Sequence, residues 1–324
     1  MKISVCMGLY NGEKYIEEQL DSILHQTRRP DEVILCDDGS TDDTVQIVRE
    51  FLEKKELQGS WKLLRNQVNK GYPENFYYAM GLCTSDVVFL ADQDDIWSPD
   101  KLEKMAGILE AHPEISCLCC KFGLVDQNGS DIHSMMNPTR NHGTGKLKKV
   151  NAEGVFYKTE WPGMVLAYRN SWYRNWSGKQ QEHTETMRKI PHDFLLCARA
   201  AEEDGFYQMD EELAYHRRHD HNAGGEEHRL RRLLNKQRKM KEINDYLTML
   251  QALEQGEVMQ TPEGITALRT KRDSMQGRMS ALQSGKRIAV LTNAWKTRKQ
   301  VRTATVICDI LIVKQRVISP DRSS

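Results

Sequence analysis

The first part of the chain alternates short, continuously apolar runs with amphipathic stretches of helical period. Continuous apolar runs are typical of strands buried on both faces, and apolar positions three and four residues apart are typical of the helices that cover them. The predicted strands are Ile3–Met7, Glu32–Cys36, Trp61–Leu64, Val87–Ala91 and Ile115–Cys120, and the predicted helices are Glu13–His25, Thr41–Lys54, Pro73–Leu82 and Pro99–Ala111. Strict alternation of strand and helix predicts an α/β fold with a parallel sheet covered on both faces.

Beyond this region the pattern changes twice. Residues 122–154 are polar and contain several glycines, which predicts a mobile flap with a hairpin turn at Gln127–Gly129. Met164–Tyr168 and Leu213–Arg217 are then predicted strands, and Pro191–Glu202 is a predicted helix. After Gly225, long helices are predicted by apolar residues at helical spacing, namely Leu230, Leu233, Leu234, Met240, Ile243, Leu247 and Leu250.

Composition and charge add a second division of the chain. Its 324 residues are 39% apolar and 28% charged, which excludes collagen-like, low-complexity and wholly disordered proteins. Basic and acidic residues number 46 each, but residues 229–324 hold 20 basic and 8 acidic residues, which leaves 26 and 38 for residues 1–228. We therefore predict an α/β domain over residues 1–225 and a basic, mainly helical region over 226–324, with different roles.

Three observations bear on location and partners. No apolar run approaches the ~20 residues that a membrane-spanning helix needs, and the start of the chain lacks a secretory signal pattern. The eight cysteines lie mostly in apolar runs, which indicates reduced thiols and a cytoplasmic protein. The basic residues between Arg229 and Lys241 leave two roles open: peripheral contact with the anionic inner face of a membrane, or a solvated helix face. No motif supports nucleic-acid binding, so we expect no nucleic-acid partner.

The most informative segment for chemistry is an acidic run directly after a predicted buried strand. Asp92, Asp94 and Asp95 follow Val87–Ala91. Like charges packed at a strand end raise each other's pKa unless a cation neutralises them, so the segment predicts Mg²⁺ or Mn²⁺ holding phosphates. Capping of the next helix is the alternative, but it would account for only one of the three carboxylates.

A second acidic loop, from Asp37 to Asp42, follows the strand Glu32–Cys36 in the same way. One carboxylate there can accept the ring N–H of a uracil, thymine or guanine base, and a solvated helix cap is the alternative. The chain contains neither a P-loop lysine motif nor the dinucleotide-binding fingerprint, so kinase and dehydrogenase functions lack their phosphate-binding loops.

These segments, in this order, resemble the family 2 glycosyltransferases, which are inverting, nucleotide-sugar-dependent enzymes of the GT-A fold. The resemblance covers residues 1 to about 225, and its acidic segment is similar to that of bacterial rhamnosyltransferase-like members. It rests on Ile3-Ser4-Val5 leading to Tyr10-Asn11-Gly12, on Asp37-Asp38-Gly39-Ser40-Thr41-Asp42, on Asn69-Lys70-Gly71 with Asn75-Phe76, and on Asp92-Gln93-Asp94-Asp95-Ile96-Trp97.

The resemblance implies a role for each matching residue on the donor side. Asp38 would bind the pyrimidine, and Tyr10 would stack near the base. Asn69 and Gly71 would lie on the nucleotide side of the site. Asp92 would lie by the ribose and the metal-bound phosphates. Asp94 would ligate the divalent ion, Mn²⁺ or Mg²⁺.

Two later segments complete the implied site. Asp193 stands in the family's His-Asp segment, whose aspartate is the general base for the acceptor hydroxyl; judged without the family, it is a helix N-terminal carboxylate. The stretch from Leu213 resembles the family's terminal tyrosine-arginine-x-histidine stretch and places His219 by the metal and Arg217 by the diphosphate, for which arginine is suited. A zinc site or a solvated loop is the alternative for its histidines.

The leading prediction is thus an inverting glycosyltransferase. It would move a hexosyl or deoxyhexosyl group from a nucleoside diphosphate sugar, UDP- or dTDP-linked, to a glycan or lipid-linked acceptor in surface polysaccharide assembly. Two alternatives stay open. A nucleotidyltransferase acting on a sugar phosphate would also cluster carboxylates on an α/β sheet, although Gly8–Lys14 offers only one basic residue to grip a triphosphate. A noncatalytic nucleotide-sugar-binding scaffold would recruit partners through its basic helices.

Overall fold

The computed structural model describes residues 1–132, 143–158, 161–177, 190–219, 234–298 and 300–315. The chain divides into two compact units. One comprises residues 1–151 with 160–219, and the other comprises residues 152–159 with 220–324. The predicted boundary near residue 225 lies outside the described residues, but the assignment of residues 152–159 to the second unit is a feature that the sequence pattern did not reveal.

The first unit is built on one nine-stranded sheet in the order β3-β2-β1-β4-β8-β6-β9-β5, with β7 also paired to β9. The strands are β1 (Ile3–Leu9), β2 (Glu32–Asp37), β3 (Trp61–Arg65), β4 (Val87–Ala91), β5 (Ile96–Trp97), β6 (Cys117–Val125), β7 (Leu147–Lys149), β8 (Leu166–Arg169) and β9 (Phe206–Arg217). Strands β1 to β4, β6 and β9 share one direction, whereas β5, β7 and β8 run against their neighbours. The sheet is therefore mostly parallel, which confirms the α/β prediction, and β5, β7 and β8 are its antiparallel members.

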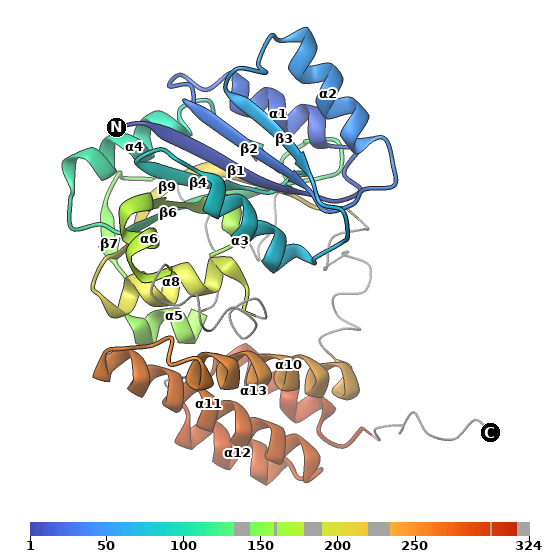
Figure 1. Cartoon of the computed structure of the whole chain (residues 1–324). Coiled ribbons are helices and arrows are strands. Elements are labelled where there is room, and N and C mark those ends of the chain that lie inside the picture. Colours follow the sequence, from blue (N-terminus) through green and yellow to red (C-terminus); the bar gives the residue numbers. More distant parts are fainter. Residues whose placement is uncertain (133–142, 159–160, 178–189, 220–233, 299, 316–324) are drawn as a thin grey trace. The chain divides into compact units, whose positions relative to one another are not determined.

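Helices cover both faces of the parallel part of this sheet, as predicted. Helices α1 (Ile16–Leu24) and α2 (Thr44–Lys54) lie on one face and α3 (Tyr72–Leu82) lies on the other (Figure 1). The remaining helices of this unit are α4 (Lys101–Ala111), the 3₁₀ helix η1 (Gly163–Val165), α6 (Asn170–Ser177) and α8 (His192–Glu202). Because β2 and β4 are buried at every position, their sequences are continuous apolar runs with polar residues only at the ends.

The strand register gathers the chemically interesting loops at one edge of the sheet. Leu9 of β1 pairs with Asp37 of β2, and Asp37 pairs in turn with Arg65 of β3. On the other side of β1, Met7 pairs with Ala91 of β4. The segments that follow these four strands therefore begin side by side, at the carboxyl ends where α/β sheets bind ligands.

The polar region after β6 contains regular structure on both sides of residues 133–142, which lie outside the described structure. Strand β6 continues to Val125, and the predicted turn is confirmed: the Gly129 N–H donates to the Asp126 carbonyl at 3.0 Å, with a φ of 80° at Gly129. Strand β7 then pairs with β9. All eight cysteines are free, and seven are buried, including the three of β6 that were expected to lie in the core.

The second unit is helical. It contains α5 (Ala152–Lys158), α10 (Lys236–Gln255), α11 (Pro262–Gln283), α12 (Arg287–Lys296) and α13 (Thr303–Ile312). Its core cluster comprises Ile243, Ala281, Leu282, Val290, Ile312 and Val313, against which Met240 and Leu247 pack. The helical period predicted from Met240 to Leu250 is thus confirmed, whereas Leu230 and Leu233 lie outside the described residues. None of the helices in the described ranges is long and apolar enough to cross a membrane.

Candidate active site

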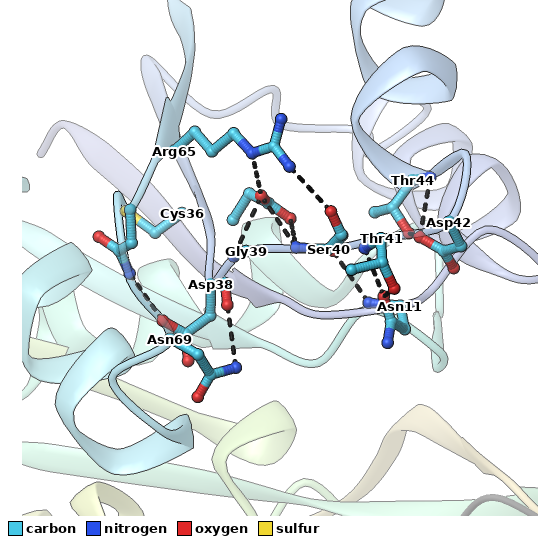
Figure 2. Close-up of polar contacts among 12 residues, drawn as sticks. Asn11, Cys36, Asp38, Gly39, Ser40, Thr41, Asp42, Thr44, Arg65 and Asn69 are labelled. Carbon is cyan, nitrogen blue, oxygen red and sulfur yellow. Dashed lines mark hydrogen bonds and ion pairs between the residues drawn. The ribbon is translucent and has the colours of Figure 1, made fainter.

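The loop after β2 is tied to the loop after β1 (Figure 2). The Asp37 carboxylate accepts hydrogen bonds from the backbone N–H of Gly39 and of Ser40 at 3.2 Å and forms an ion pair with Arg65 at 3.2 Å. Asn11, which has a φ of 47°, donates its backbone N–H to Ser40 Oγ and accepts from the Thr41 N–H. The two loops that resemble nucleotide-binding segments are therefore one connected structure.

Asp38 connects this structure to the loop after β3. The side chain is 3% exposed, and its Oδ1 accepts from Asn66 Nδ2 at 2.9 Å and from the Lys70 N–H at 2.8 Å. Its Oδ2 accepts from the Gly71 N–H at 2.8 Å, and Asn69 Nδ2 donates to the Asp38 carbonyl. Gly71 has a φ of 82°, which a residue without a Cβ adopts freely. The structure therefore brings Asp38, Asn69 and Gly71 together, and Asp38 fixes the shape of that loop.

Tyr10 is held at this edge by a residue of the acidic segment. Gln93 Oε1 accepts from the Tyr10 N–H and Gln93 Nε2 donates to the Tyr10 carbonyl, both at 2.9 Å. A Cβ on Gly12 would lie 2.4 Å from Gln93 Oε1, so only glycine leaves room for this amide. The Tyr10 ring is 49% exposed. It is free to contact a ligand, while its backbone is aligned with the segment that carries Asp92 and Asp94.

The carboxylates after β4 have different surroundings. Burial raises the pKa of Asp92 well above its usual range, and the charges of Asp95 and Asp94 act in the same direction. Burial also raises the pKa of Asp95, although the hydrogen bond with His216 Nδ1 opposes it. Lys101 lies below them with a fully buried ammonium that donates to the Met164 carbonyl, and burial lowers its pKa to about 8. No pattern in the sequence indicated this buried positive charge.

Strand β9 brings the terminal histidine segment to the same place. Its pairing with β5 places Ile96 opposite Tyr215, and His219 Nε2 lies 2.9 Å from Asp94 Oδ2. The imidazole of His219 packs on the Tyr15 ring, with centroids 4.7 Å apart. The two residues that the resemblance assigns to a metal are therefore in contact, although they are about 125 positions apart in the chain.

Arg217 is placed differently from the expectation. Its side chain is 1% exposed, and its guanidinium donates to the Asp94 carbonyl at 2.9 Å and pairs with Glu18 at 2.5 Å. It also lies over the Tyr15 ring, 4.8 Å from the centroid. The predicted phosphate ligand thus faces the protein interior in this structure, where it braces the acidic segment.

These groups fit a divalent cation that is shared with a diphosphate. Carboxylate oxygens suit Mg²⁺ and Mn²⁺, and Mg²⁺ is usually held by one or two carboxylates plus substrate phosphates; an imidazole ligand is typical of transition-metal ions and so fits Mn²⁺ better than Mg²⁺. Over the described ranges, no group of three His, Cys, Asp or Glu side chains is arranged as a complete metal site. Asp94 and His219 supply part of a ligand set, and the raised pKa of Asp92 shows that the loop would gain from a nearby cation.

Asp193 lies in the first turn of α8, where its Oδ1 accepts from the Phe194 N–H at 2.7 Å. Burial raises its pKa to about 6, against the effect of that hydrogen bond. The Asp193 charge contributes to the raised pKa of Asp92 and of Tyr72, so the base candidate is electrostatically coupled to the acidic segment. The structure therefore brings Asp193 and Asp92 to one site, from positions about 100 residues apart in the sequence.

Two aromatic neighbours of Asp193 were missed by sequence reasoning. His192 is 3% exposed, stacks on Phe76 with centroids 4.0 Å apart, and has no hydrogen-bond partner for either ring nitrogen in the described structure. Tyr72 follows Gly71 and is 60% exposed. Burial raises the pKa of its hydroxyl to about 12, with Asp193 and Asp92 acting in the same direction. Only the three-dimensional position of Tyr72, where the charges of Asp193 and Asp92 both act on its hydroxyl, distinguishes it from other exposed tyrosines.

These groups gather at the carboxyl end of the parallel strands of an α/β sheet, and comparison with known proteins gives the family. Residues 4–173, just over half of the chain, match the profile of "Glycosyl transferase family 2". The chain belongs to this family. A Haemophilus influenzae protein (strain ATCC 51907 / DSM 11121 / KW20 / Rd) named only as a glycosyltransferase is 35% identical over 140 residues, which is 42% of this chain and 51% of that protein.

Solved structures support the GT-A fold. Staphylococcus aureus TarS, residues 1–349 in complex with UDP-GlcNAc, has a TM-score of 0.54 at 18% identity, covering 97% of this chain and 91% of that one. In sequence, TarS of strain Mu50 / ATCC 700699, a poly(ribitol-phosphate) β-N-acetylglucosaminyltransferase, is 36% identical over 114 residues, 35% of this chain and 19% of that protein. The mannosyltransferase PcManGT from Pyrobaculum calidifontis, in complex with GDP-Man and Mn²⁺, has a TM-score of 0.50 at 18% identity over 95% of this chain and 85% of that one. The chain matches only about 39 to 51% of the length of the curated relatives that head the comparison.

Proposed function

We propose that this protein is an inverting glycosyltransferase that moves a hexosyl or deoxyhexosyl group from a nucleoside diphosphate sugar to a glycan or lipid-linked acceptor in surface polysaccharide assembly. The observation that carries the proposal is the position of Asp193: its carboxylate is buried, which raises its pKa, and its charge in turn raises the pKa of Asp92 in the acidic segment after β4. A base on one side and a diphosphate-holding loop on the other are what a single displacement requires. Family membership favours this function over a nucleotidyltransferase.

In the proposed reaction, Asp193 accepts the proton of the acceptor hydroxyl. The hydroxyl oxygen attacks the anomeric carbon from the face opposite the diphosphate, and the bond from that carbon to the diphosphate oxygen breaks with its electron pair on the leaving group. One divalent cation, Mn²⁺ or Mg²⁺, would neutralise charge on that leaving group. Asp94 and His219 would hold it, with Asp92 beside the ribose. Arg217 would keep the acidic segment in position through the Asp94 carbonyl.

The donor would be bound by the connected loops after β1, β2 and β3. Asp38 would accept from the base through Oδ2, which takes only one of the three hydrogen bonds that shape the loop and so retains an unused lone pair. The exposed Tyr10 ring would stack near the base. A UDP- or dTDP-sugar is favoured. Structural neighbours bind UDP-GlcNAc and GDP-Man, so the donor base is a matter for direct measurement.

Calorimetric titration of the full chain with UDP, dTDP and GDP, each with and without Mn²⁺ and with ATP as the control, tests this proposal. Metal-dependent binding of one diphosphate is the expected result, and it would also name the base. Binding of a triphosphate in preference would favour the nucleotidyltransferase, and donor binding without any transfer would favour the scaffold. Asp193→Asn distinguishes the enzyme from the scaffold. In an enzyme the variant should bind the diphosphate as the parent does and lose the transfer activity that the parent has, whereas in a scaffold neither protein transfers.

A further inference from the structure

The second unit carries large apolar side chains on its surface. Three of them are on α12: Ile288 is 68% exposed, Leu291 is 50% exposed and Trp295 is 70% exposed. Two more, Ile307 and Leu311 on α13, are 54% and 56% exposed. Single exposed apolar residues are normal, but several at helical spacing on α12, with two more on a helix that contacts it, indicate an interaction surface.

The spacing places these residues on common faces. At about 100° per residue, Ile288, Leu291 and Trp295 fall within an arc of about 60° on α12. Val290, on the opposite side of α12, belongs to the core cluster. Ile307 and Leu311 are four residues apart on α13 and also share a face, while Ile312 of that helix is in the core. Each helix therefore has one apolar face in the unit and a second one directed outward.

The charges around this surface have one sign. Arg287 and Lys296 are exposed and flank the apolar stripe of α12 on its two sides, and the Arg298 guanidinium lies 5.6 Å from the Trp295 ring centroid. Over residues 284–315 the sequence contains a single acidic residue, Asp309. That residue is 2% exposed and is paired with Arg278, with Nε to Oδ2 at 2.6 Å and Nη2 to Oδ1 at 2.8 Å. The outward surface is consequently apolar and positive.

The basic segment that the sequence suggested for membrane contact is partly used elsewhere. Lys236 is 6% exposed and its ammonium donates to the Val313 carbonyl at 2.9 Å. Arg238 and Lys239 both pair with Glu242. Arg229, Arg231 and Arg232 lie outside the described residues. Three of the basic side chains of α10 are thus already engaged with groups of the protein.

We propose that the outer faces of α12 and α13 bind the surface of an anionic lipid bilayer, with the apolar side chains below the headgroups and the basic side chains among them. Lipids satisfy both features at once: acyl chains for the apolar stripe and anionic headgroups for its basic flanks. Trp295 beside Arg298 suits the boundary between the two layers. Membrane binding extends the proposed function and rests on it, since a lipid-linked acceptor would be held in the bilayer that α12 and α13 bind.

A second copy of the chain is a poorer occupant on charge grounds. In a two-fold symmetric contact each partner presents the same patch, so the basic flanks of one copy would approach those of the other. An acidic protein partner would satisfy the flanks, but it would also have to present an apolar surface that matches the stripe, whereas a bilayer supplies both layers without a matching shape. These two occupants are alternative outcomes of the test.

The test is co-sedimentation of the full chain with vesicles of phosphatidylcholine alone and of phosphatidylcholine with about one third phosphatidylglycerol. Binding is expected to the anionic vesicles and to fall steeply with added salt. The variant Ile288→Ser/Leu291→Ser/Trp295→Ser should lose at least about tenfold in partitioning, and each of Arg287→Gln and Lys296→Gln should lose about fivefold. Val68→Ser is the matched control, because Val68 is 70% exposed in the first unit and should leave vesicle binding unchanged.

Metal-dependent diphosphate binding by the same variants, measured by calorimetry, is expected to equal that of the parent protein. This measurement shows that they fold, and it separates failure of the membrane proposal from failure of the proposed function. Equal binding of the triple variant and the parent to anionic vesicles would overturn the membrane proposal. So would a lack of binding by the parent, or a parent dimer in sedimentation analysis that the triple variant loses.

Discussion

The raised pKa of Asp193 gives a quantitative prediction for transfer activity. With its pKa at about 6, the carboxylate is about 9% ionised at pH 5 and about 91% ionised at pH 7. An aspartate with an ordinary pKa of 3.8 would be about 94% ionised already at pH 5. Because only the ionised form accepts the acceptor proton, the buried base predicts a tenfold rise in kcat between pH 5 and pH 7, and an ordinary aspartate predicts almost none.

The assay is release of nucleoside diphosphate at saturating donor, acceptor and Mn²⁺, so that kcat reports the fully bound enzyme. Neighbouring groups have to be considered separately. His192, whose pKa burial lowers to about 3, and Tyr72, whose pKa is raised to about 12, do not titrate in this window. Asp92 also has a raised pKa, and its effect would appear in donor binding, measured by calorimetry at both pH values. A kcat that is flat from pH 5 to pH 7, while donor binding is intact, would refute the assignment of Asp193.

Four further outcomes follow from the same contacts. Because the pKa of Asp193 is higher in the folded state, the parent protein loses up to about 3 kcal/mol of stability as the pH rises from 3.8 through about 6. Asp193→Asn lacks this loss, so the free energy of unfolding of the variant minus that of the parent should be up to about 3 kcal/mol larger at pH 8 than at pH 3, as measured by denaturant titration at both pH values. Asp94→Asn should abolish Mn²⁺-dependent donor binding while leaving the thermal midpoint almost unchanged, and a variant that still responds to Mn²⁺ would exclude Asp94 as a ligand. Asp38→Asn should weaken nucleotide binding and also destabilise the fold by about 2 kcal/mol, because its amide cannot accept from all three donors; Asp43→Asn, at an exposed position, is the control. Arg217→Ala should destabilise the fold by about 1–3 kcal/mol, chiefly by leaving the Asp94 carbonyl without its donor, since the half-exposed Glu18 carboxylate would be hydrated; a loss below about 0.5 kcal/mol in urea unfolding would show that the bracing role is wrong.

The elements best predicted from the sequence are those whose signal is local. Strand β4 was predicted at its observed bounds, Val87–Ala91, because a strand buried on both faces is written as a continuous apolar run. Strand β9 was predicted only at its end, from Leu213, because its first half is partly exposed and pairs with β7, which lies 57 or more positions earlier in the chain. The antiparallel insertion of β8 beside β4 left no mark in the helix–strand alternation.

The candidate site likewise contains residues that local motifs predicted and residues whose surroundings only the fold supplies. Family motifs pointed to Asp38, Asp94 and His219, and the fold places each at the predicted edge of the sheet, although their roles remain predictions. The orientation of Arg217 could not be read from its sequence, because whether a guanidinium faces a ligand or Glu18 depends on a helix about 200 residues earlier. Tyr72 and Lys101 matter only through neighbours that the fold supplies.

The pairing of β9 has a consequence for the order in which the protein can form during synthesis. This strand joins β6 on one edge and β5 with β7 on the other, and it carries the histidine that meets Asp94. Until its residues leave the ribosome, β6 has an open edge and the acidic segment lacks its partner. Such long-range parallel pairing is slow and leaves an aggregation-prone edge exposed in the meantime. A truncation before residue 206 should therefore expose the sheet to aggregation, rather than leave a smaller, working domain.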